Sequence, residues 1–206
     1  MSDVKHFDVD GVLDDVVRLF WRQGWSATGI QNVVAVTGVS RSSLYATFGG
    51  KNSLYVAALR GYIEKYSAPA FARLASGASG VLGGLPAVEE FFAALIRQRC
   101  AGPHAGWGCL ITNAHAGPEC SDPQVRELLD EHHLQVREAM CGALAIAAER
   151  GQLTWPVDLD AVAGVLVVLA YGVNLRSRAG ADAETLHSAV ATVLHPLRAT
   201  HPPEEG

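Results

Sequence analysis

Apolar residues recur at helical spacing along nearly the whole chain. Between Asp10 and Gln23 they occupy the i, i+3, i+4 and i+7 positions of an amphipathic helix that buries one face. Alternating apolar and polar residues bounded by turns, the pattern typical of strands, are scarce, while alanine and leucine are abundant. The pattern therefore predicts an all-α fold.

A second, shorter helix is expected directly after the first. Gly24 is a natural stop for the first helix, because glycine adopts the left-handed conformation that ends helices. Ser26 or Thr28 is expected to cap the second helix. That helix directs Val33 toward the core and ends at Gly38.

The third predicted helix runs from about residue 41 to residue 48. Ser40 has the side chain of an N-cap, and the pair Gly49-Gly50 ends the helix. A fourth helix is predicted to begin near Lys51 and to bury apolar residues as far as Ile63.

The remainder of the chain is also predicted to be helical. Residues 76–86 are glycine-rich and are expected to form a connector. We expect two domains, at residues 1–62 and 63–206. Five predicted helices lie beyond the connector, at residues 88–100, 107–115, 122–150, 158–176 and 183–197.

Composition indicates a globular protein. The chain has 206 residues, of which 49% are hydrophobic and 18% are charged, so it can bury a large core. No uninterrupted apolar run reaches the roughly 18 residues of a membrane span, so no membrane partner is expected. The N-terminus lacks a basic start followed by an apolar core. A cytoplasmic location is therefore expected.

The segment GVSRSSLYATFGGK, residues 38–51, suggests a helix-turn-helix. Two short helices joined by a glycine turn form this DNA-binding unit when apolar residues such as Leu44 and Phe48 hold the second helix on the core. Arginine can pair with guanine edges, serine and threonine with bases or phosphates, and tyrosine with phosphates. A three-helix bundle without a DNA-binding role is the alternative. The residues left on outward or flanking faces are Arg41, Ser42, Ser43, Tyr45 and Thr47.

Charge placement favours the DNA-binding interpretation. The chain has a formal net charge of −5, yet residues 16–63 contain no acid and five basic residues, a local charge of +5. The remainder therefore carries −10. Because phosphate binding depends on the local field, an acidic total is compatible with DNA binding.

The run SATGIQNVVAVTGVSRSSLYATFGGKNSLYVAAL resembles the DNA-binding domain of tetracycline-repressor-like (TetR) regulators, over about residues 10–62. The resemblance implies that Thr28, Tyr45 and Lys51 contact phosphates. It implies that the major groove is read by Arg41, Ser42, Ser43 and Thr47. It also implies a homodimeric repressor that binds palindromic, double-stranded operator DNA and is released by a small-molecule effector.

The second half would then hold the effector and form the dimer. Residues 158–176 are apolar on nearly every face, as expected of a helix buried against both its own body and a partner. A monomer with a large core is the alternative. No cofactor is expected. Candidate residues for an effector pocket are Tyr62, Tyr66, Phe71, Phe91, Phe92, Trp107, Cys109 and Tyr171.

The cysteines suggest three alternatives. Cys109 begins a predicted short helix, whose dipole favours a thiolate, and a cysteine at this position resembles oxidant- or electrophile-sensing relatives. Cys109 with His104 or His115 could mimic a Cys/His nucleophile, but no catalytic motif is present and no enzyme activity is predicted. A metal-responsive regulator is a further alternative, but the spacing of the potential ligands is irregular and no metal site is predicted. Those ligands are Cys100, His104, Cys109, His115, Cys120, His132 and His133.

Overall fold

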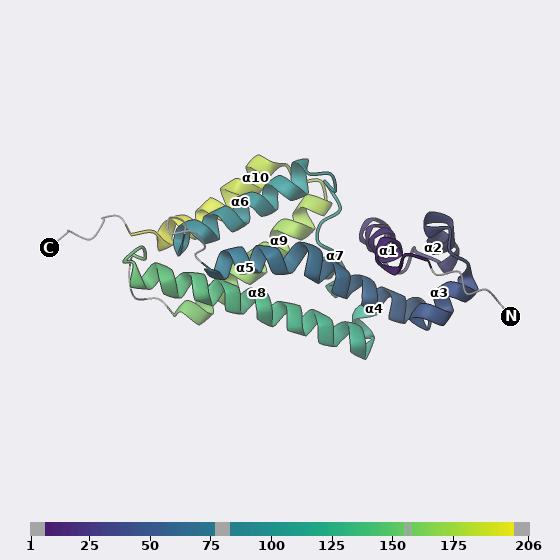
Figure 1. The fold of residues 1–206 in the computed structure, drawn as a ribbon. Helices are drawn as coiled ribbons and strands as arrows, with labels where there is room; N and C mark the ends of the chain where they lie inside the picture. Colours follow the sequence, from purple (N-terminus) through teal and green to yellow (C-terminus); the bar gives the residue numbers. More distant parts are fainter. Residues whose placement is uncertain (1–6, 77–82, 155, 157, 200–206) are drawn as a thin grey trace. The chain divides into compact units, whose positions relative to one another are not determined.

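The computed structural model describes residues 7–76, 83–154, 156 and 158–199, and confirms the all-α fold (Figure 1). Among these residues the β-structure is limited to one isolated antiparallel bridge, between Leu153 and Arg198. Backbone contacts divide the chain into two compact units. The N-terminal unit comprises residues 1–66 and 109–130, and the C-terminal unit comprises residues 67–108 and 131–206.

The N-terminal unit is built around α1. This helix packs against α4, α2 and α7, and it buries Phe20 and Trp21 almost completely. After α4 the chain continues into a π-helical turn, η1 (Ile63–Ser67). The other helices of this unit are α1 (Val9–Gln23), α2 (Ile30–Thr37), α3 (Arg41–Phe48), α4 (Lys51–Tyr62), α7 (Leu110–His115) and the 3₁₀-helix η2 (Pro118–Ser121).

The C-terminal unit has its own core. α6 packs against α5, α9 and α10 around a continuous apolar cluster that includes Phe92, Ile96 and Leu166. Inside it, Arg99 Nε donates a 2.7 Å hydrogen bond to Asn174 Oδ1, which joins α6 to α9. The helices are α5 (Ala68–Ser76), α6 (Leu85–Ala101), residues 131–149 of α8 (Pro123–Glu149), α9 (Leu159–Arg178), α10 (Ala183–Leu194) and η3 (His195–Leu197).

Several predicted boundaries are wrong. Gly29, rather than Ser26 or Thr28, is the N-cap of α2, and its N–H donates to Asn32 Oδ1 at 2.7 Å. The pattern also missed α5, which continues the chain directly after η1. Of the expected connector, residues 77–82 lie outside the described residues, and α6 begins within the remainder, at Leu85.

α9 is the one helix of the described residues whose length and composition would suffice to cross a membrane. Its most apolar window has a mean hydropathy of 1.6, and 33% of that window is buried. Ala163, Leu166 and Val167 belong to the core of the C-terminal unit, and the polar Asn174 bonds to Arg99 from the same helix. α9 is therefore a core helix that keeps an apolar outer face.

Candidate nucleic-acid interface

The turn between α2 and α3 depends on one glycine and one serine. Gly38 adopts a left-handed conformation with φ of 69°, which a side chain would disfavour. Ser40 then caps α3, and its Oγ accepts a 3.2 Å hydrogen bond from the Ser43 N–H. Leu44 is fully buried, so it fixes the face that α3 turns toward the core. The predicted helix-turn-helix is confirmed.

The remaining side chains of α3 are available to a ligand to different degrees. Arg41, Ser42 and Thr47 are exposed, whereas Ser43 and Tyr45 are half-buried. The Arg41 guanidinium carbon lies 5.0 Å from the centre of the Tyr45 ring, one helical turn further along. Ala46 is also exposed. Ala46 was not among the outward residues predicted from the sequence, although its position one helical turn after Ser42 predicts the same face.

The serine hydroxyls form a local network at the start of α3. Ser40 Oγ lies 2.9 Å from both Ser42 Oγ and Ser43 Oγ. These hydroxyls therefore already have hydrogen-bonding partners within the protein.

The two flanking residues expected at phosphates also have internal partners. Thr28 is fully buried, and its hydroxyl donates a 2.7 Å hydrogen bond to the Gly24 carbonyl. Lys51 Nζ donates to the Trp25 carbonyl at 2.8 Å and lies 3.9 Å from the centre of the Trp25 ring. Burial lowers the pKa of Lys51, and the nearby Glu119 carboxylate opposes that shift. Phosphate contacts by Thr28 and Lys51 stay predictions.

α4 forms hydrogen bonds with residues 119 and 122, which are distant from it in sequence. The Tyr55 hydroxyl donates a buried 3.2 Å hydrogen bond to Glu119 Oε1. Burial, and then the Glu119 charge and hydrogen bond, raise the pKa of Tyr55, so its hydroxyl stays protonated and can donate. A Cβ on Gly117 would collide with the Glu119 carboxylate, so glycine makes room for it. Nearby, Asn52 Nδ2 donates to Asp122 Oδ2 at 3.4 Å.

This packing changes the electrostatic picture of the N-terminal unit. Residues 109–130 bring four acids and one arginine, a net charge of −3, into the same unit as the acid-free residues 16–63. Within the acid-free stretch, Arg18 already pairs with Asp14 and Asp15, at 3.8 and 3.9 Å. The positive charge available to DNA is therefore local to a few side chains and does not extend over the whole unit.

Comparison with known families decides the identity of this unit. Residues 12–58 match the family model described as "Bacterial regulatory proteins, tetR family". Residues 84–193, more than half of the chain, match "Tetracyclin repressor-like, C-terminal domain". The chain belongs to the TetR family of transcriptional regulators. It is thus a member of a family of DNA-binding regulators and not of an enzyme family.

Individual TetR-family relatives align over almost the full length. The chain is 29% identical to the HTH-type transcriptional repressor ComR of Escherichia coli K12, over 92% of this chain and 89% of the relative. It is 25% identical to the uncharacterized HTH-type transcriptional regulator YezE of Bacillus subtilis 168, over 96% and 100%.

Solved structures share the TetR fold at lower identity. A cysteine mutant of the TetR family regulator CifR, complexed with 26-bp double-strand operator DNA, is 21% identical, with a TM-score of 0.81 over 95% of this chain and all of that chain. The reduced form of E. coli NemR is 22% identical, with a TM-score of 0.78 over 94% and 100%.

The residues proposed for an effector pocket are shared between the two compact units. Tyr62 and Tyr66 stack with ring centres 5.2 Å apart in the N-terminal unit, to which Cys109 also belongs. In the C-terminal unit, Phe92 is fully buried, and Phe91 meets it edge-on at 5.4 Å. Each of the other candidates has a histidine neighbour: Phe71 has His132, Trp107 has His104, and Tyr171 has His133, whose Nδ1 lies 3.2 Å from its hydroxyl.

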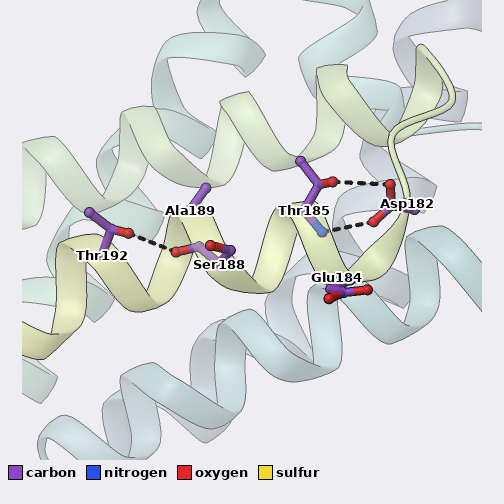
Figure 2. A pocket seen from close by; sticks show the side chains of 6 residues that line it. All are labelled: Asp182, Glu184, Thr185, Ser188, Ala189 and Thr192. Atoms are coloured by element: carbon purple, nitrogen blue, oxygen red, sulfur yellow. Dashed lines mark hydrogen bonds between the residues drawn. The ribbon is translucent and has the colours of Figure 1, made fainter.

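A shallow pocket lies elsewhere, along the outer side of α10 (Figure 2). Two of its hydroxyl groups form local hydrogen bonds: Thr185 donates to the Asp182 carboxylate and Thr192 to the Ser188 carbonyl. None of the predicted effector residues lines it. The lining residues are Asp182, Glu184, Thr185, Ser188, Ala189 and Thr192.

The cysteines differ in their surroundings. Cys109 is buried and is the N-cap of α7. Burial, followed by a neighbouring aspartate, raises the pKa of both Cys100 and Cys141, which makes them poorer thiolates. In the part of the chain that the structure describes, no group of three His, Cys, Asp or Glu side chains is placed to hold a metal ion.

Proposed function

We propose that this TetR-family regulator is a homodimeric, cytoplasmic repressor that binds palindromic operator DNA and is released by a small-molecule effector. The observation that carries the proposal is the exposed polar face of α3, on a capped helix-turn-helix within an acid-free stretch. The E. coli relative that is named a transcriptional repressor supports the sign of regulation.

Phosphate contacts would come from both flanks of α3. The Tyr45 hydroxyl is a suitable donor, and Lys51 stands at the first turn of α4, where helix N–H groups also favour an anion. To reach a phosphate, Lys51 would exchange its bond to the Trp25 carbonyl for an ionic one. Thr28, whose hydroxyl is buried, would reach a phosphate only after a local change.

Dimerisation would use α9 and α10. α9 exposes Val165 at 55% and Val168 at 68%, which is unusual for branched apolar residues on a folded surface. Gly164 and Gly172 have open space where a Cβ would stand, so a partner helix could approach closely. Two copies joined in this way would present two α3 helices to successive major grooves.

An effector would act through α4. This helix leads through η1 directly into α5 of the C-terminal unit, and its side chains also form hydrogen bonds with residues 119 and 122, close to the start of α8. An effector bound among the aromatic residues of the C-terminal half would favour one position of α4 and so change the spacing of the recognition helices. Because the candidate lining residues are mostly aromatic, an apolar or weakly polar effector fits best.

The test is to measure operator binding by the purified full-length protein, using fluorescence anisotropy at several salt concentrations. We expect Lys51→Ala to weaken binding to all sequences and to reduce the slope of log K against log salt by about one. Arg97→Ala, which removes an exposed cation from α6, is the control and should leave the slope unchanged. Absence of salt-dependent DNA binding by the wild type would refute the proposal.

A second candidate is regulation through the Cys109 thiol. The favouring observation is that α7, which Cys109 caps, packs against both α1 and α4. A modified Cys109 would no longer fit its buried position and would disturb both helices. Iodoacetamide should therefore weaken operator binding by the wild type and by Cys141→Ser, but not by Cys109→Ser. Equal loss in all three proteins, or loss in none, would exclude this candidate.

A further inference from the structure

The recognition helix offers few groups that can identify a base, and the structure ranks them. Arg41 is the only basic residue between residues 24 and 50, so no other α3 side chain can donate two hydrogen bonds to a guanine edge as arginine does. Given that α3 binds operator DNA, as proposed above, we infer that Arg41, supported by Tyr45, reads a guanine in each half-site. We further infer that Ala46 contacts the methyl group of a nearby thymine.

The position of Tyr45 prepares Arg41 for this role. The exposed guanidinium lies over the Tyr45 ring, with 5.0 Å between its carbon and the ring centre. Stacking on an aromatic face restricts an otherwise flexible side chain and leaves the N–H groups at the guanidinium edge available. Tyr45 is therefore a positioning residue for base reading, separate from any phosphate contact of its hydroxyl.

The serines are less suitable as base readers. Ser42 and Ser43 share hydrogen bonds with the Ser40 hydroxyl, and Ser43 is half-buried. A base would have to displace bonds that hold the start of α3. Thr47 is exposed, but at about 100° per residue it lies on the flank opposite Tyr45.

Ala46 completes the outward face. At the same rotation per residue, Arg41, Tyr45 and Ala46 fall within an arc of about 140° on α3, and Ala46 lies about 160° from the buried Leu44. An exposed alanine has only a methyl group to offer, and in the major groove the thymine methyl is the apolar partner that distinguishes one base pair from the others. The helical rise places residues 41 and 46 about 7.5 Å apart along the axis, so the guanine and thymine should lie within about two base pairs of each other.

The first experiment is selection of bound sequences from random duplex DNA by the full-length wild type. We expect each enriched half-site to contain a guanine and a thymine within about two base pairs. Replacing that guanine by 7-deazaguanine removes the N7 acceptor and should weaken wild-type binding about tenfold or more, but should hardly affect Arg41→Ala. Replacing the thymine by deoxyuridine removes the methyl and should weaken wild-type binding several-fold, but should hardly affect Ala46→Gly.

A matched pair of variants tests the role of Tyr45. Tyr45→Phe keeps the ring and loses the hydroxyl, so it should keep the guanine preference while binding all sequences more weakly. Tyr45→Leu loses the ring and should also lose most of the preference for guanine over 7-deazaguanine. If both variants keep that preference, Tyr45 does not position Arg41, and this part of the inference fails.

The outcomes separate this inference from the proposed function. The inference would be overturned if the protein bound DNA selectively and with salt dependence, but at half-sites without the guanine and thymine. It would also be overturned if wild type and variants were equally sensitive to the modified bases. Either result would leave the proposed function standing. No enrichment and no salt-dependent binding would overturn the proposed function and the inference with it. Circular dichroism of each variant excludes loss of the fold as the cause.

Discussion

α3 and α9 both leave part of their surface uncovered, but the two surfaces are chemically opposite. α3 is short, and its exposed side chains combine an arginine, hydroxyl groups and small methyl groups. α9 is 20 residues long and exposes valines and a leucine beside glycines with open space above them. A polar face suits a hydrated, charged ligand, whereas a branched apolar face is stabilised by contact with another apolar surface.

The comparison shows that exposure alone does not identify a binding surface; the chemistry of the exposed atoms does. Hydration of the polar side chains of α3 is favourable. Exposure of each valine side chain of α9 to water is unfavourable, and covering it would lower the free energy. We therefore expect α9 to be covered in the functional protein and α3 to be covered only when DNA is bound.

The largest expected effect comes from charging the α9 face. Val165→Glu combined with Val168→Glu should convert the proposed dimer to monomers, because in that dimer carboxylates would face each other across the two-fold axis. Losing one of two linked half-site contacts should weaken operator binding by about 100-fold or more. Sedimentation velocity and fluorescence anisotropy measure the two effects.

Leu134→Glu is the control for this change. Leu134 is 53% exposed on α8, so the substitution adds the same charge to another exposed apolar position. It should leave both the dimer and operator affinity unchanged. A dimer that survives the α9 substitutions would show that another surface joins the two copies.

The next largest effect is the difference in stability loss between a substitution on the buried face of α3 and one on the exposed face of α9. Leu44 is fully buried, so Leu44→Ala should lower the free energy of unfolding by about 2–5 kcal/mol. Val168→Ala removes apolar atoms that already face water in the monomer and should change its stability by less than about 0.5 kcal/mol. Urea unfolding followed by circular dichroism, at protein concentrations below dimerisation, gives both values; equal losses would contradict the difference in burial.

A smaller effect is expected at the buried contact behind α4. Glu119→Ala removes the acceptor of the Tyr55 hydroxyl, and a hydrogen bond to a charged group contributes about 1.5–3 kcal/mol. Glu119→Gln keeps an oxygen acceptor and should lose less. In a double-mutant cycle with Tyr55→Phe, the two losses should be non-additive; strict additivity would show that the pair contributes no coupling.

The smallest effect compares the caps of the two helices. Ser40 caps α3, and Asp158 caps α9 by accepting from the N–H groups of Asp160 and Ala161, each at 3.1 Å. Replacing either cap with alanine should cost about 1 kcal/mol of stability. Only Ser40→Ala should also weaken operator binding, because α3 is the helix proposed to read DNA. An equal loss in Asp158→Ala would mean that the effect arises from stability alone.

Local sequence features predicted the helix-turn-helix well, for physical reasons. Apolar spacing, the glycines at 24, 38 and 49, and the Ser40 cap all act within one or two helical turns, so they can be read along the chain. The Gly29 cap was missed because serine and threonine are the commoner capping residues. Here the Thr28 hydroxyl instead bonds backward to the Gly24 carbonyl.

Contacts between distant segments could not be read in the same way. Nothing near Tyr55 indicates that Glu119 will meet it, since the two are 64 residues apart. The effector residues were likewise predicted from residue type alone. Aromatic side chains fill cores and line pockets alike, and only their three-dimensional neighbours distinguish the two roles.

The insertion of residues 109–130 into the N-terminal unit has a consequence for protein synthesis. A nascent chain that ends before residue 109 holds every residue of the helix-turn-helix, but it lacks α7 and the acceptor of the Tyr55 hydroxyl. Because chains emerge from the ribosome N-terminus first, the N-terminal unit cannot be completed until residue 130 has emerged, well after its helix-turn-helix. We expect the regulator to gain its full affinity for DNA only after α7 and the start of α8 have left the ribosome, so that unfinished chains do not occupy the operator.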